Sequence, residues 1–156
     1  MMDEQLRQLL DRQEITDLLH EYCRGLDRMD LQAVASVFTD DCIVDYGPEE
    51  RLKSFGAAGV AKDLRRMWRW ARTSHHLSNV QVWFEDRDHA RGISYLIAWH
   101  ERPDGSAGTL WGQYHDRFVR TPAGWRIAQR RLLMNGNDAG FDVNVNHFER
   151  IPPDNG

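Results

Sequence analysis

The sequence predicts an α+β fold, in which helices pack on one face of an antiparallel sheet. Up to about residue 71, apolar residues recur at steps of three and four, the period of an amphipathic helix. From His76 onward the period is two, and aromatic or β-branched residues dominate the segments. Short turn sequences separate these later segments, so we expect hairpins between antiparallel neighbours.

Three helices are expected in the first half of the chain. The first runs from Asp11 to about Met29, and Asp11 with Glu14 resembles a capping box at its start. Asp30 is expected to cap a second, shorter helix. A third helix is expected from Gly59 to Ala71, where apolar residues again have helical spacing.

Five segments are predicted to be strands. A short strand, Cys42–Tyr46, ends at Gly47-Pro48, and residues 49–56 are expected to form a loop. Four longer strands are expected over residues 76–85, 89–102, 109–120 and 125–134.

We assign residues 1–156 to one domain, with a core over about residues 10–134 and a tail over residues 135–156. The tail is expected to be irregular. Its apolar residues nevertheless indicate that it packs on the domain; they are Phe141, Val143, Val145, Phe148 and Ile151.

The charge balance argues against nucleic-acid or membrane partners. The chain has 20 Lys and Arg against 24 Asp and Glu, a net charge of -4, so no excess of cations can neutralise phosphates. Its apolar runs are shorter than the roughly 20 residues that cross a bilayer. Charged residues also interrupt the first segment, where a secretory signal would be continuous. We therefore expect a cytoplasmic protein, in which Cys23 and Cys42 are reduced packing residues.

Four arginines lie close together at positions 65, 66, 69 and 72, with Trp68 and Trp70 between them. Such a run could stack and neutralise nucleic acid. The acidic net charge favours the alternative, a solvent-exposed helix face. Nucleotide and hydrolase motifs are missing, since the chain has no GxSxG elbow, no GxxxxGKS/T loop and no GxGxxG fingerprint.

Asp27 is the first candidate for chemistry. It continues the apolar row of Leu19 and Cys23 near the end of the first helix. The helix dipole and partial burial are both expected to raise the pKa of this carboxyl, so a proton-donating partner such as an imidazole is expected. The alternative is that Asp27 only begins the turn into the second helix.

His75 and His76 are the second candidates, and adjacent strand residues point to opposite faces. Val82 shares the parity of His76, and Leu77 shares that of His75, so alternation does not decide which histidine points inward. A bulge could reverse the count. A structural role is the alternative for either one. The seven histidines show no HxH or HExxH spacing, so no metal site is predicted.

The ordered set of local sequences resembles the SnoaL-like branch of the nuclear transport factor 2-like superfamily over nearly all of residues 10–134. The matching segments are Tyr22–Asp27, Phe38–Cys42, Thr73–Asn79 and Gly124–Ile127. The resemblance implies a cone-shaped α+β barrel, with a curved antiparallel sheet wrapped around N-terminal helices. It also implies a homo-oligomer, a dimer or trimer.

Within this superfamily the pattern is similar to that of scytalone dehydratase, hexachlorocyclohexane dehydrochlorinase and bile acid 7α-dehydratase. These lyases use an Asp and His pair and need no metal or organic cofactor. The resemblance assigns the pair to Asp27 and His75, and a proton-donating role to Tyr22. Arg130 or Arg131 is expected to supply a late-strand arginine, with Arg131 as the pocket candidate.

The implied function is a cofactor-independent elimination on a small apolar substrate, cyclic or polycyclic, with His75 as general base. Aromatic residues are the candidate pocket walls, although ordinary packing is the alternative for each; they are Tyr46, Trp68, Trp83, Trp99 and Trp111. Two other functions remain open, because the same fold is used by isomerases or cyclases and by noncatalytic binding or partner subunits.

Overall fold

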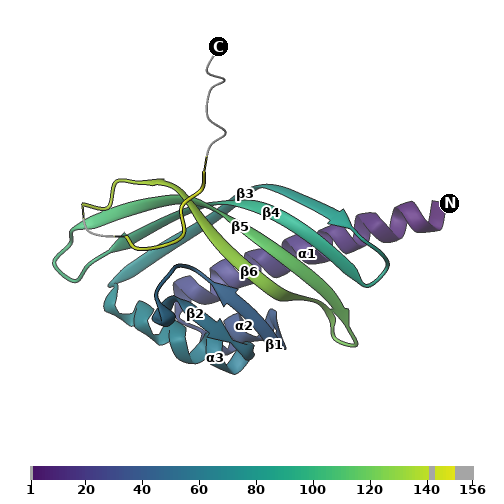
Figure 1. Cartoon of the computed structure of the whole chain (residues 1–156), viewed down its shortest axis with the longest axis horizontal. Coiled ribbons are helices and arrows are strands. Elements are labelled where there is room, and N and C mark those ends of the chain that lie inside the picture. The colour runs from purple at the N-terminus through teal and green to yellow at the C-terminus, as the bar shows by residue number, and fades with distance from the viewer. Residues whose placement is uncertain (1, 141–142, 150–156) are drawn as a thin grey trace, which may run out of the picture.

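The computed structural model describes residues 2–140 and 143–149. Over these residues, helices near the N-terminus pack against one curved, unclosed sheet of six strands (Figure 1). The strand order across the sheet is β2-β1-β6-β5-β4-β3. The architecture confirms the predicted α+β class.

The first helix is longer than predicted. Helix α1 spans Met2–Arg28, so the proposed capping box at Asp11 is wrong. The Asp11 carboxylate instead lies buried within the helix, where it accepts hydrogen bonds from Trp125 Nε1 (3.0 Å) and Arg120 Nη2 (2.7 Å). These bonds join the middle of α1 to strands that come more than a hundred residues later. No helix in the described part of the chain is both long and apolar enough to cross a membrane.

The turn after α1 follows the prediction. Helix α1 ends before Met29, whose φ of 55° reverses the chain. Helix α2, Leu31–Ser36, then starts with Asp30 as its cap, because Asp30 Oδ1 accepts a hydrogen bond from the Ala33 backbone N–H (3.1 Å).

The segment between α2 and the long strands contains more regular structure than predicted. Strand β1 spans Phe38–Asp45. The expected loop holds a 3₁₀ turn, η1 (Glu50–Leu52), and a short strand, β2 (Lys53–Phe55), paired antiparallel with β1. A strand of three residues is too short to show a period-two pattern, which is why the sequence did not reveal it. The third helix divides into α3, Gly56–Asp63, and the 3₁₀ helix η2, Leu64–Arg69.

The four long strands form the predicted antiparallel meander. They are β3 (Arg72–Phe84), β4 (His89–Glu101), β5 (Ala107–Thr121) and β6 (Gly124–Asn137). Strand β1 adds to β6 in parallel, so the sheet is mixed. Because β2 and β3 are free edges, the sheet curves without closing into a barrel.

The helices cover one face of the sheet, and the core lies between the two layers (Figure 1). Several of its largest side chains are fully buried, among them Ile15, Leu19 and Trp125. Burial of such side chains contributes roughly 1.5–3 kcal/mol each. The opposite sheet face has no covering layer in the described chain.

The first residues of the tail extend β6 to Asn137, and the described residues after it pack on the domain with no regular structure beyond one bridge between Met134 and His147. Phe148 donates its backbone N–H to the Met134 carbonyl (2.8 Å), and Asn146 donates its own to the Tyr46 carbonyl (3.1 Å). Val145 contacts the core. These contacts confirm the predicted packing of the tail, while Phe141 and Ile151 lie outside the described residues.

Candidate active site

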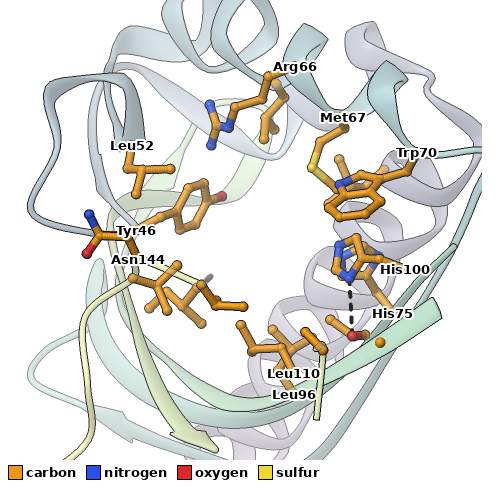
Figure 2. Close-up of a pocket in the computed structure, with 18 of the residues that line it drawn as sticks. Tyr46, Leu52, Arg66, Met67, Trp70, His75, Leu96, His100, Leu110 and Asn144 are labelled. Carbon is orange, nitrogen blue, oxygen red and sulfur yellow. Dashed lines mark hydrogen bonds between the residues drawn. The ribbon is translucent and has the colours of Figure 1, made fainter. Parts of the chain in front are cut away.

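A cavity of about 200 Å³ lies between the helix-covered sheet face, the end of α1, η2 and the tail (Figure 2). Aliphatic side chains form a large part of its wall, among them Leu26, Leu52, Leu64, Leu96, Leu110 and Leu132. Its polar groups come from tyrosine, histidine and arginine side chains. An apolar hollow with polar side chains at defined places is the usual form of a small-molecule site.

Asp27 and His75 meet at this cavity. The distance from His75 Nδ1 to Asp27 Oδ1 is 2.6 Å, and His75 also donates its backbone N–H to Asp27 Oδ2 (2.9 Å). The His75 side chain is 4% exposed and lines the cavity, and Asp27 lies behind it. Because an ionised carboxylate only accepts hydrogen bonds, Nδ1 carries the proton and Nε2 remains as the acceptor.

A bulge in β3 decides which histidine points inward. The pairing of β3 with β4 shifts between Ser78 and Gln81, and Asn79 has a φ of 50°. Before the bulge, His75 and the other odd-numbered residues lie on the inner face. After the bulge, Val82 and the other even-numbered residues do. The parity therefore reverses within the strand. His76 is exposed on the outer face, where its Nε2 lies 2.7 Å from Ser74 Oγ.

The pKa of Asp27 differs from its prediction. Burial alone raises the pKa of this carboxyl, as expected from the sequence, but hydrogen bonds from the His75 ring, the His75 backbone and Thr73 Oγ1 (2.9 Å) outweigh burial. The net result is a lowered pKa, so Asp27 stays ionised near neutral pH. Asp27 therefore does more than begin the turn into α2, because its carboxylate accepts hydrogen bonds from Thr73 and His75.

Tyrosines supply the hydroxyl groups of the cavity. Tyr22 and Tyr46 line it, with their hydroxyl oxygens 2.6 Å apart, and Tyr114 packs edge-on against the Tyr22 ring. Burial raises the pKa of all three phenols well above 10. They are therefore protonated and able to donate at any physiological pH.

Neither candidate for the late-strand arginine, Arg130 or Arg131, lines this cavity. The Arg131 side chain is 60% exposed on the outer face, 3.9 Å from an oxygen of Asp45, so its predicted place in the pocket is wrong. Arg130 is fully buried behind the tyrosines. It donates two hydrogen bonds to Asp116 (2.9 and 2.8 Å), and its guanidinium lies 4.4 Å from the centre of the Tyr22 ring.

Four of the predicted wall residues also lie outside the cavity. Trp68 is 56% exposed under the Arg65 guanidinium. The other three tryptophans point to the outer face of the sheet, because the residues next to them in their strands point inward; they are Trp83, Trp99 and Trp111. Aromatic residues are favoured in strands on either face of a sheet. Residue type alone therefore did not show which face these side chains occupy. Tyr46 is the predicted wall residue that does line the cavity.

His100 and Trp70 are site residues that the sequence reasoning missed. The His100 ring contacts His75 edge-on (centroids 5.3 Å apart) and Trp70 (5.0 Å), and the three rings form one wall (Figure 2). Burial, and then the neighbouring His75, lower the pKa of His100 to about 4. His100 lies two residues after Ala98 and four after Leu96 in β4, so it shares the inner face of the strand with these buried residues. This spacing of two was the signal available in the sequence.

The arginine run is only partly a solvent-exposed face. Arg65 points away, but Arg66 and Arg69 line the cavity, and Arg51 joins them from η1. The 3₁₀ geometry of η2 turns these side chains toward the hollow. No group of three or more His, Cys, Asp or Glu side chains that could hold a metal ion occurs among the described residues.

The chain is similar in sequence and in fold to known proteins. Residues 7–131 match the sequence profile of the SnoaL-like domain. A scytalone dehydratase-like protein from Novosphingobium aromaticivorans is 26% identical, with a TM-score of 0.88 over 97% of this chain and 100% of that chain.

Two further solved structures share the fold at lower identity. A hexachlorocyclohexane dehydrochlorinase from Novosphingobium barchaimii is 21% identical, with a TM-score of 0.78 over 96% of this chain and 99% of that chain. An NTF2-like protein with a cystatin-like fold from Novosphingobium aromaticivorans is 24% identical, with a TM-score of 0.74 over 85% and 87% of the two chains.

Proposed function

This chain belongs to the SnoaL-like domain family, and we propose that it is a lyase that eliminates a leaving group from a small ring compound without a cofactor. The observation that carries the proposal is the hydrogen bond between Asp27 and His75 at the wall of an apolar cavity. Similarity to a scytalone dehydratase-like protein supports the class of reaction.

His75 is the proposed general base. Its Nε2 takes a proton from a carbon next to an activating group such as a carbonyl, and the C–H electron pair becomes the new double bond. The leaving group departs with the electrons of its own bond to carbon. Asp27, already ionised, stabilises the imidazolium that forms and holds the ring by its Nδ1.

The proposed proton donor to the leaving group is Tyr22. Its phenol is protonated, and its contact with the Tyr46 hydroxyl lets one phenol support the other as a donor. When hydroxide leaves, the proton from Tyr22 makes it water. The proton on His75 then returns to the phenolate through the cavity, so the enzyme ends in its starting state.

A neutral His100 suits this chemistry. Its pKa of about 4 keeps its ring uncharged at neutral pH, so it does not repel the imidazolium of His75. Together with Trp70 it shields the base from water and presents a flat wall to a ring.

The test uses two readouts on a panel of bicyclic β-hydroxy ketones. Near-ultraviolet absorbance detects the conjugated enone that elimination produces, and NMR in D₂O detects exchange of the proton next to the carbonyl. His75→Ala should lower both by about 10²- to 10⁴-fold, the usual contribution of a general base. The neighbouring exposed residue provides a matched control, and His76→Ala should retain both activities.

Each outcome has a meaning. The proposal is supported if His75→Ala loses both exchange and elimination while His76→Ala keeps both. Exchange with no enone, but with a rearranged product, assigns the same base to an isomerase or cyclase. Equal turnover in the wild type and His75→Ala rejects His75 as the base.

A further inference from the structure

The cavity carries an excess of positive charge. Its lining includes Arg51, Arg66 and Arg69, and no Asp or Glu among the described residues. Arg51 is paired with Glu49. Arg66 and Arg69 form no ion pair with a carboxylate in the described chain, although the protein as a whole has a net charge of -4. The local charge is therefore opposite to that of the whole protein.

Arg66 and Arg69 are held by a backbone carbonyl and by aromatic rings, and these contacts bring no negative charge to the guanidinium groups. Arg66 Nη1 donates to the Asp63 backbone carbonyl (2.8 Å), and its guanidinium lies 5.8 Å from the centre of the Tyr46 ring. Figure 2 shows this guanidinium turned toward the interior of the pocket. The Arg69 guanidinium lies 4.9 Å from the centre of the Trp70 ring, beside the wall formed with His100.

The arginines repel one another. Arg69 is exposed at the rim of the cavity, and its partial burial lowers the pKa of its guanidinium, as do the charges of Arg51, Arg66 and Arg102. Like charges that are crowded at the edge of an apolar cavity are unfavourable until an anion joins them. A guanidinium is also the side chain best suited to grip a planar anion, through two parallel hydrogen bonds.

We propose that Arg66 and Arg69 bind an anionic substituent of the substrate, a carboxylate in the simplest case, while the cavity holds an apolar ring against His75. This proposal rests on the proposed lyase function for the place of the reacting carbon. It narrows the substrate class to small aromatic or alicyclic acids.

The size of the cavity agrees with such a ligand. An apolar cavity of about 150 Å³ accepts benzene, and this cavity measures about 200 Å³. It therefore fits one ring or two small fused rings, which is smaller than the polycyclic substrate that the predicted aromatic walls suggested. Arg66 and Arg69 reach the cavity from η2 and His75 reaches it from β3, so an acid bound by its carboxylate would present its ring to the base.

A binding experiment without turnover tests the anion site. Calorimetry compares cinnamate with cinnamamide, a neutral molecule of nearly the same shape. The wild type should bind cinnamate about ten- to hundredfold more tightly, the usual effect of hydrogen bonds to a charged group. The Arg66→Gln/Arg69→Gln variant should lose that preference and bind the amide as the wild type does. Equal affinity of the wild type for acid and amide overturns the proposal.

Controls separate the site from general charge and from folding. Arg65→Gln removes a neighbouring charge that does not line the cavity, and it should keep the preference for the acid. Circular dichroism of the double variant, together with its retained amide binding, shows that it is folded. An equal loss of preference in Arg65→Gln would show a diffuse charge effect and overturn the assignment to Arg66 and Arg69.

The two proposals fail in different ways. If His75→Ala loses elimination while wild-type protein does not prefer cinnamate, the lyase stands and the anion site is rejected. If the preference for cinnamate depends on Arg66 and Arg69 while His75→Ala turns over normally, the anion site stands and the base assignment is rejected.

Discussion

The Nδ1 atom of His75 lies 2.6 Å from Oδ1 of Asp27, although the two residues are 48 positions apart in the chain. The contact joins the last turn of α1 to the first half of β3. Asp27 also accepts hydrogen bonds from the His75 backbone and from Thr73, so the carboxylate holds both the ring and the strand that carries it. Such triple anchoring leaves the imidazole in one tautomer.

Asp27→Asn is expected to lower turnover by roughly 10²- to 10⁴-fold if His75 is the base, because the amide can donate to Nδ1 and so favour the wrong tautomer. The fold should remain. Steady-state kinetics on any substrate that shows His75-dependent elimination checks this. Asp30→Asn is the matched control, since Asn caps a helix as well as Asp does. Equal losses in the two variants would contradict a specific role for Asp27.

Tyr22→Phe removes the proposed proton donor while keeping the ring. We expect kcat to fall by about a hundredfold for a poor leaving group such as hydroxide, the lower end of the range for loss of an acid catalyst. A good leaving group such as chloride should show little effect, because it departs without a proton. Tyr95→Phe, on the outer face, is the control. An equal loss for both leaving groups would argue for a packing role of the hydroxyl.

Protonation of His100 should destabilise the protein between pH 6.5 and 4. The folded pKa is about 4 and the ordinary value is 6.5, so in this range the unfolded chain binds more protons than the folded protein. Stability therefore rises with pH across the window and is lost as the pH falls. Each pKa unit corresponds to about 1.4 kcal/mol, so the total is on the order of 3 kcal/mol.

Urea unfolding at several pH values measures this effect. His100→Gln should flatten the dependence of unfolding free energy on pH between 6.5 and 4. The exposed His76→Gln should keep the wild-type slope. If His100→Gln also keeps the wild-type slope, another group is responsible for the pH dependence.

Asp116→Ala should be among the most destabilising single substitutions. The Arg130 and Asp116 side chains are 0% and 2% exposed, so removal of the carboxylate leaves a buried charge without its partner. The expected loss is about 3–5 kcal/mol. Glu85→Gln breaks the exposed pair with Arg117 and should cost less than about 1 kcal/mol. Thermal and urea unfolding compare the two; similar small losses would mean that Arg130 finds another partner.

The outer face of the sheet is expected to form the contact between subunits of a homo-oligomer. Tyr95, Ile97 and Trp111 are each about two-fifths exposed, and Ile97 pairs directly with Trp111 across β4 and β5. An exposed apolar cluster of this kind is typical of an interface. Light scattering should find a dimer or trimer, and Ile97→Glu should shift it toward monomer. Lys62→Glu, on α3, is the charge control and should leave the assembly unchanged.

Local pattern was enough for most of the secondary structure. The positions of α1, α2 and the four long strands follow from hydrophobic periods of 3.6 and 2 and from turn residues between them. Residue pattern identified Asp27 and the His75-His76 pair as candidates, and family resemblance then paired Asp27 with His75, which the structure brings together. The short strand β2 was not predicted, because three residues are too few to show a hydrophobic period.

The direction of side chains in the sheet required the tertiary structure. A single bulge at Asn79 reverses the parity of β3, so no count along the sequence could choose between His75 and His76. The same limit misplaced Trp99 and Trp111, because either face of a strand accepts an aromatic residue.

The layered α+β design and the candidate proton-transfer residues follow from the amino-acid sequence, because both depend on residue type and near-neighbour spacing. The surroundings of those residues depend on tertiary packing. His100 of β4 and Arg66 and Arg69 of η2 line the same cavity as His75 of β3. Contacts between segments so far apart in the chain are not encoded by any local hydrophobic period.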